Sequence, residues 1–132
     1  MTTEMFYRLL RPDEDPTLGL FAKNQFSDVI SVEDHVTNRS QAGYASRYIS
    51  CCKTWDAVRD FAANTYTSPK RIVQTTIKYP TIQTIDLTDP NNQLLYFPHN
   101  QRAINNVNRF QEVLILDHVP PDCISNIMVL PL

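Results

Sequence analysis

The scarcity of glycine is the feature of this sequence that most limits what the chain can fold into. Only two glycines, Gly19 and Gly43, occur in 132 residues. The dinucleotide-binding turn of doubly wound α/β proteins, the phosphate-binding loop and the glycine-flanked serine turn of hydrolases all need glycines at fixed spacings. Because those glycines are absent, the sequence excludes all three kinds of site.

Apolar and polar residues alternate through much of the chain, which predicts strands. The expected strands cover residues 5–10, 44–51, 71–79, 81–88, 111–119 and 123–130. Two segments are expected to be helices, and each follows a capping residue. Ser31, with Asp34 three residues later, precedes 32–38, and Thr54 precedes 55–63, where apolar residues also recur at helical spacing. A loop and one short helix are expected in 91–110. This order predicts an α+β fold built on antiparallel sheets.

The length and the charge are those of an ordinary globular protein. We expect a single domain over residues 1–132, which buries roughly two-thirds of its unfolded surface. Its net charge of −2, with scattered lysines and arginines, argues against a surface that holds nucleic acid. The apolar run near the N-terminus is short and is followed by acids, so we expect neither a secretion signal nor a membrane span.

The cysteines and histidines bear on the compartment and on metal binding. Two of the three cysteines are adjacent, which argues against a disulfide framework and favours a reducing compartment. No Cys-x-x-Cys pair occurs, and His35, His99 and His118 lie far apart in the sequence, so we expect no bound metal. We therefore expect a cytoplasmic protein, either resident there or delivered into a cell as an effector.

Four motifs follow one another in an order that resembles a known enzyme family. They are "FYRLLRPDEDP", "EDHVTNRS", "YASRYISCCKT" and "QEVLILDHVPPDCI". Their order resembles that of the ADP-ribosyltransferases of the cholera and pertussis toxin type, the Arg-Ser-Glu class, over residues 5–63 and 109–127. The resemblance implies an ADP-ribosyltransferase-like fold, with two packed, mainly antiparallel β-sheets and short inserted helices. It also implies NAD as the substrate, with no metal.

The resemblance assigns four residues to the site. Arg8 falls where the family has its NAD-binding arginine, and Ser50 matches the first serine of the family's Ser-Thr-Ser strand. Glu112 matches the catalytic glutamate, and His35 resembles the histidine of the toxin-like branch. The resemblance therefore implies catalytic roles for Glu112, Ser50 and Arg8, and contacts to NAD from Arg8, His35 and Ser50.

Such a site has a clear chemical logic. Breaking the bond between nicotinamide and ribose develops positive charge on the sugar, and a nearby carboxylate stabilises that charge. Glu112 would supply the carboxylate and Ser50 a hydroxyl that orients it, while Arg8 would clamp a phosphate or ribose oxygen. Each residue also has a purely structural interpretation: an exposed arginine at a sheet edge, a core hydroxyl, a solvent-facing glutamate and, for His35, a surface or capping histidine.

The sequence departs from the family at two places. Cys51 and Cys52 stand where the family has threonine and serine, and side-chain alternation puts Cys52 on the same face as Ser50. Phe110 stands two residues before Glu112, where arginine-modifying members carry glutamate and others glutamine, so arginine is a doubtful acceptor.

The expected function is that of a mono-ADP-ribosyltransferase. It would cleave NAD and pass ADP-ribose to a macromolecular acceptor, expected to be a protein, or to water. The alternative is a catalytically inactive binding or regulatory module that keeps the fold. Phosphate transfer from RNA on a related fold fits less well, because no basic surface is evident in the sequence.

Overall fold

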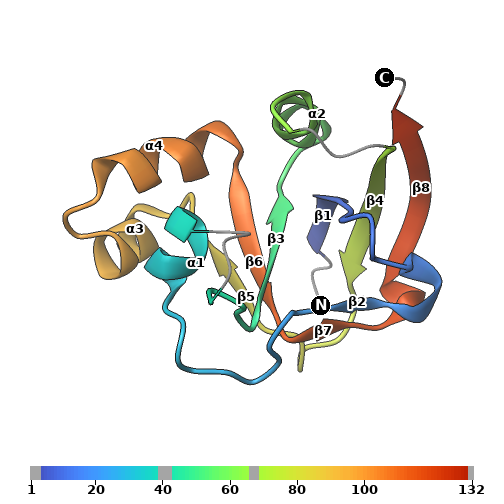
Figure 1. Ribbon diagram of the computed structural model, residues 1–132, viewed down its shortest axis with the longest axis horizontal. Coiled ribbons are helices and arrows are strands. Elements are labelled where there is room, and N and C mark those ends of the chain that lie inside the picture. The colour runs from blue at the N-terminus through green and yellow to red at the C-terminus, as the bar shows by residue number, and fades with distance from the viewer. Residues whose placement is uncertain (1–3, 39–42, 66–68, 131–132) are drawn as a thin grey trace.

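A six-stranded antiparallel sheet forms the centre of the fold in the computed structural model, which describes residues 4–38, 43–65 and 69–130 (Figure 1). The strand order is β5-β6-β3-β1-β4-β8. The strands are β1 (Glu4–Leu9), β3 (Tyr48–Cys52), β4 (Lys70–Ile77), β5 (Thr84–Asp86), β6 (Glu112–Leu116) and β8 (Ile124–Leu130). A separate two-stranded ribbon joins β2 (Leu20–Phe21) to β7 (His118–Val119).

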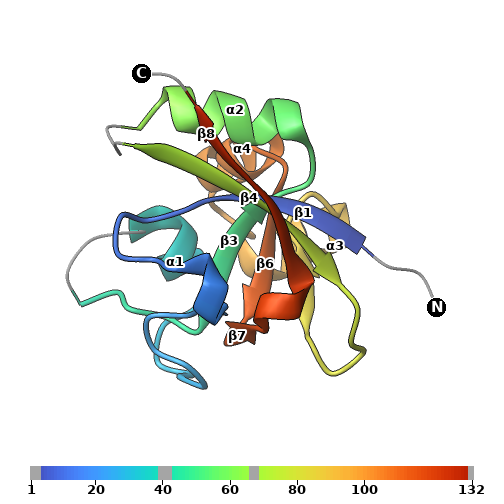
Figure 2. The same ribbon diagram turned by 90° about the vertical axis from the view of Figure 1, so that its right-hand side faces the viewer.

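The six-stranded sheet consists of two halves that meet between β1 and β3. These two strands are paired in register at Tyr7 and Cys52, whereas β3 and β6 pair along five positions and β1 and β4 along six. The strands of the two halves cross in Figure 2. The predicted α+β class with antiparallel sheets and inserted helices is confirmed, and the two expected sheets correspond to the halves of one bent sheet.

Helices cover the sheet on its β6 side and at the junction of its halves (Figure 1). They are α1 (Val32–Asn38), α2 (Trp55–Ala63), α3 (Pro90–Tyr96) and α4 (Gln101–Arg109), with short 3₁₀ turns at Pro16–Leu18 and Pro121–Cys123. The predicted caps are confirmed, because Ser31 Oγ accepts from the Asp34 amide at 3.0 Å and Thr54 Oγ1 from the Ala57 amide at 3.1 Å. In the described part of the chain, no helix is long and apolar enough to cross a membrane.

Three apolar clusters hold these layers together. The first lies between the sheet halves and the β2–β7 ribbon, and it includes Phe6, Ile49, Cys51 and Ile115. The second packs α1, α3 and α4 against β6, and the third packs α2 against β3 and β4. Side chains alternate along β3 and β6, so Ile49 and Cys51 of β3 and Ile115 of β6 pack in the first cluster. The other face of both strands is then available for the site.

Two expected elements are each divided in two in the structure, and the strand expected at 81–88 is shorter and covers Thr84–Asp86. Residues 111–119 form two strands instead of one, because Asp117 adopts a left-handed conformation with φ of 69° and its carboxylate binds Arg47 and the Phe26 amide. Residues 91–110 hold two helices, because Asp89 and Asn100 cap separate helix starts. Arg39 and Ser40, the end of the second motif, lie outside the described residues.

Candidate functional site

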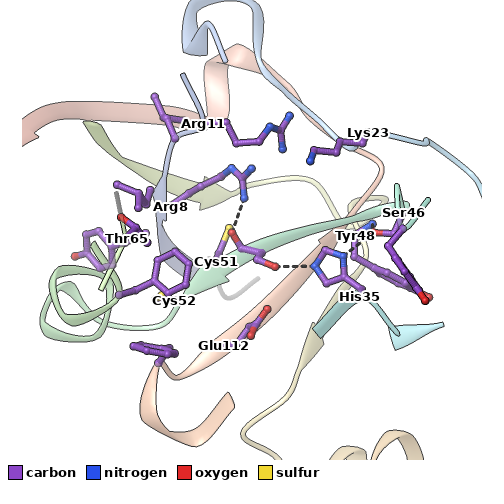
Figure 3. Close-up of a pocket in the computed structure, with 17 residues that line it drawn as sticks. Arg8, Arg11, Lys23, His35, Ser46, Tyr48, Cys51, Cys52, Thr65 and Glu112 are labelled. Atoms are coloured by element: carbon purple, nitrogen blue, oxygen red, sulfur yellow. Dashed lines mark hydrogen bonds between the residues drawn. The ribbon is translucent and has the colours of Figure 1, made fainter. Parts of the chain in front are cut away.

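A pocket of about 340 Å³ lies where the two halves of the sheet separate (Figure 3). All four residues predicted for the site line it, and they come from four different elements. Arg8 lies on β1, His35 on α1, Ser50 on β3, and Glu112 at the first position of β6. The structure therefore brings together residues that are separated by more than a hundred positions in the sequence, as Arg8 and Glu112 are.

Arg8 is buried and held in a fixed orientation. Its guanidinium donates two hydrogen bonds to the Glu14 carboxylate, from Nε at 3.2 Å and from Nη2 at 2.9 Å. A third bond runs from Nη1 to the Ser50 carbonyl at 2.7 Å, across the gap where β1 leaves β3. Because β1 is an inner strand and Arg8 is only 7% exposed, the interpretation as an exposed arginine at a sheet edge is wrong.

Glu14 is the residue that orients Arg8, and sequence reasoning missed it. Its carboxylate also accepts the Arg11 amide at 2.7 Å, within a turn closed by the Glu14 amide and the Arg11 carbonyl. Arg71 donates to the carbonyls of Arg11 and Glu14, which fixes the same turn from the other side. The signal in the sequence was weak, because Glu14 is one of three acids in a loop that otherwise suits solvent.

A chain of hydrogen bonds links His35 to two serines. His35 Nδ1 lies 2.6 Å from Ser46 Oγ, and Nε2 lies 2.7 Å from Ser50 Oγ. Tyr48 meets the imidazole edge-on, with 5.7 Å between the ring centroids. When Nε2 carries the proton, His35 donates to Ser50 and the Ser50 hydroxyl can donate to another acceptor. His35 is therefore a pocket residue with a defined orientation, and the interpretation as a surface histidine is wrong.

Glu112 is buried, with 3% of its surface exposed, so the interpretation as a solvent-facing strand residue is wrong. It pairs in register with Cys52, and the side chains of such antiparallel partners lie on the same face of the sheet. Ser50 is two residues before Cys52 and shares that face. The site face of β3 and β6 thus presents a hydroxyl, a thiol and a carboxylate to one pocket.

The two adjacent cysteines have different surroundings. Cys51 packs in the cluster between the sheet halves, and burial raises the pKa of its thiol to about 12. Cys52 belongs to the cluster under α2. The prediction that the two side chains lie on opposite faces is confirmed, and the three cysteines are free thiols.

Aromatic and basic side chains complete the pocket wall. The aromatic residues are Tyr7, Tyr44, Tyr48, Phe61 and Phe110. Tyr48 and Phe61 pack against the second and third apolar clusters and also line the pocket. Arg11 and Lys23 add two cations that the sequence analysis did not select. Among the described residues, no three histidine, cysteine or acidic side chains are placed to hold a metal ion.

The comparisons with known proteins bear on the fold. No protein-family model matches the chain, and no curated protein is similar to it in sequence. A solved structure named EcPltA superposes with a TM-score of 0.66 and 16% identity, over 98% of this chain and 83% of that one. At this identity, the similarity shows that the two chains share a fold.

Proposed function

We propose that the protein binds NAD in this pocket and transfers its ADP-ribose to an acceptor. The observation that carries the proposal is the convergence of Arg8, His35, Ser50 and Glu112 on one pocket from four elements. The resemblance assigns catalytic roles to Arg8, Ser50 and Glu112 and a contact to NAD to His35, and residues without a common role would be scattered over the surface. The resemblance to the Arg-Ser-Glu class and the α+β fold also support the proposal.

In the proposed cleavage of NAD, Glu112 stabilises the charge that develops on the ribose. As the bond between ribose C1′ and the nicotinamide nitrogen breaks, its electron pair goes to the nitrogen, and nicotinamide leaves uncharged. Positive charge then develops on the ribose, where a buried carboxylate stabilises it more strongly than one exposed to water. The acceptor's nucleophile adds to C1′ and loses its proton. Glu112 also accepts a hydrogen bond from a ribose hydroxyl, which fixes the sugar.

The other residues hold the substrate and the carboxylate in position. Ser50 donates from its hydroxyl on the same face as Glu112, and His35 fixes the direction of that hydroxyl. Arg8 anchors the Ser50 carbonyl, and so it fixes β3 next to the reacting atoms. The aromatic wall suits the nicotinamide ring. A volume of about 340 Å³ lies near the lower end of the range for small-molecule pockets, so part of the dinucleotide extends through the open mouth.

Nicotinamide release from NAD by the purified protein tests the proposal. Glu112→Gln preserves the size of the side chain and removes its charge, so we expect release to fall by at least about a hundredfold. Glu4→Gln is the matched control, because Glu4 is exposed at the start of β1, and its rate should equal that of the wild type. An unchanged rate in Glu112→Gln would remove Glu112 from the reaction.

The alternative is a non-catalytic module, favoured by one observation. Cys52 pairs with Glu112 where the family carries a hydroxyl residue, and a thiol is a weaker hydrogen-bond donor. Such a module would release no nicotinamide, and NAD would not raise its melting temperature. The acceptor is expected to be a protein. The three free cysteines favour a reducing compartment such as the cytoplasm.

A further inference from the structure

We propose that the ion pair between Lys53 and Asp86 positions Glu112 from the face of the sheet opposite to the pocket. The proposal rests on the proposed function, because these two residues would hold the carboxylate used in NAD cleavage without touching the substrate. Three observations support it: how the chain enters β6, which bonds lie on either side of that entry, and where the ion pair lies.

Glu112 is the first residue of β6, so its position depends on how the chain enters the strand. Helix α4 ends at Arg109, and Gln111 then adopts a left-handed conformation with φ of 47°, which turns the chain from the helix into β6. This conformation is unfavourable for a residue with a side chain, and it persists only where the surrounding structure holds it. The Glu112 carboxylate therefore follows a turn that needs support from its neighbours.

Main-chain hydrogen bonds hold this turn from both sides. The Lys53 amide donates to the Gln111 carbonyl at 2.9 Å, just after the end of β3. The Leu87 amide donates to the Glu112 carbonyl at 3.1 Å, just after the end of β5. Strand β6 lies between β5 and β3 (Figure 1). The start of β6 is thus bonded to the ends of two strands that do not pair with each other.

The side chains of Lys53 and Asp86 connect those two strand ends across β6. Lys53 Nζ lies 2.5 Å from Asp86 Oδ2 and donates to Thr88 Oγ1 at 2.7 Å. Asp86 Oδ1 accepts from the Thr88 amide at 2.9 Å and from the Thr88 hydroxyl at 2.6 Å. Burial alone would raise the pKa of Asp86, but the hydrogen bonds from Lys53 and Thr88 outweigh it and lower the pKa. The lysine is therefore bound to a charged acid whose orientation is fixed by the threonine.

The ion pair lies on the face of the sheet opposite to the Glu112 side chain. Asp86 pairs in register with Val113, so their side chains share a face, and Glu112, the neighbour of Val113, points the other way. Lys53, Asp86 and Thr88, all in the described part of the chain, do not line the pocket. The pair therefore acts on the reaction only through the backbone of β6, which makes Lys53 and Asp86 positioning residues.

Steady-state kinetics of nicotinamide release test the proposal. Lys53→Met and Asp86→Asn should each lower kcat by about tenfold and leave KM within about twofold of the wild type, because a small shift of a catalytic group slows the reaction without weakening substrate binding. The double variant should lose no more than either single variant, since all three remove the same pair. Lys53→Arg keeps the charge and the reach, so it should recover most of the lost kcat.

Lys78→Met is the matched control for the loss of a lysine. Lys78 is exposed, donates to the Asp122 carbonyl and lies outside the pocket lining, so its variant should have the wild-type kcat. A rise in KM with kcat unchanged in Lys53→Met or Asp86→Asn would overturn the proposal, because it would mean that these residues act on substrate binding.

Hydrogen exchange without substrate measures the restraint on β6 directly. In Lys53→Met and Asp86→Asn, the protection of the amides at positions 53 and 87 should fall by at least about tenfold. Amides of β1 and β4 should keep their wild-type protection, because a partly exposed ion pair contributes little to global stability. Unchanged protection at both positions would overturn the proposal, and so would an equal loss across the whole sheet.

The two measurements separate this proposal from the proposed function. Lower protection at positions 53 and 87, together with no nicotinamide release by the wild type, supports the hold of the ion pair on β6 and refutes the enzyme. Nicotinamide release with the wild-type kcat in both Lys53→Met and Asp86→Asn supports the enzyme and refutes the positioning role.

Discussion

Glu14→Gln should be among the most destabilising single substitutions in this protein. Glu14 accepts three hydrogen bonds, two from Arg8 and one from the Arg11 amide, and its side chain is 5% exposed. Glutamine keeps one acceptor oxygen and turns an amide N–H₂ group toward a guanidinium that also only donates. The Arg8 charge would then stay buried without a counter-charge, and such losses cost about 3–5 kcal/mol.

That cost is large compared with the total stability of a typical domain, which is roughly 5–15 kcal/mol. Urea unfolding at 25 °C, followed by circular dichroism, measures it by linear extrapolation. Asp13→Asn is the matched control, because it removes an exposed partner of Arg11 and should cost less than about 1 kcal/mol.

A second substitution separates charge burial from simple loss of packing. In Arg8→Met with Glu14→Gln, neither buried charge remains, and the double variant should be more stable than Glu14→Gln alone by about 1–3 kcal/mol. A loss below about 1 kcal/mol in Glu14→Gln would refute the argument that the buried Arg8 charge depends on Glu14. A double variant less stable than Glu14→Gln would show that Arg8 contributes through its other contacts.

Two further predictions concern acid stability and thiol reactivity. Burial would raise the pKa of Asp117, but the hydrogen bonds from Arg47 and from the Phe26 amide outweigh it and lower the pKa. Asp117 therefore stabilises the folded state fully above about pH 4, and this stabilisation is lost as the pH falls through the lowered pKa. Acid unfolding curves should show the stability difference between the wild type and Asp117→Asn shrinking over that range. Burial raises the pKa of the Cys51 thiol to about 12, so iodoacetamide at a pH near 8.5 should leave Cys51 unmodified in the folded protein and alkylate it after denaturation. Peptide mass spectrometry measures this, and alkylation of Cys51 in the folded protein would contradict the prediction.

The local elements could be predicted because their signals lie within a few residues. The Ser31 and Asp34 capping pattern predicted α1 at residues 32–38, and the Thr54 cap with the apolar spacing after it predicted α2 at 55–63. The break at Asp117 could not be predicted, because its left-handed conformation depends on Arg47, seventy positions away in the chain. Local patterns contain no information about such a partner.

The candidate site divides in the same way. The sequence by itself selected Arg8, His35, Ser50 and Glu112, because an ordered set of motifs can be read along the chain. Only the tertiary structure decided which of them are buried, that all four meet in one pocket, and that Glu14 neutralises Arg8. The physical reason is that burial and pairing depend on which distant segments approach one another. A residue's type sets the bonds it can form, and the fold decides which of those bonds it makes.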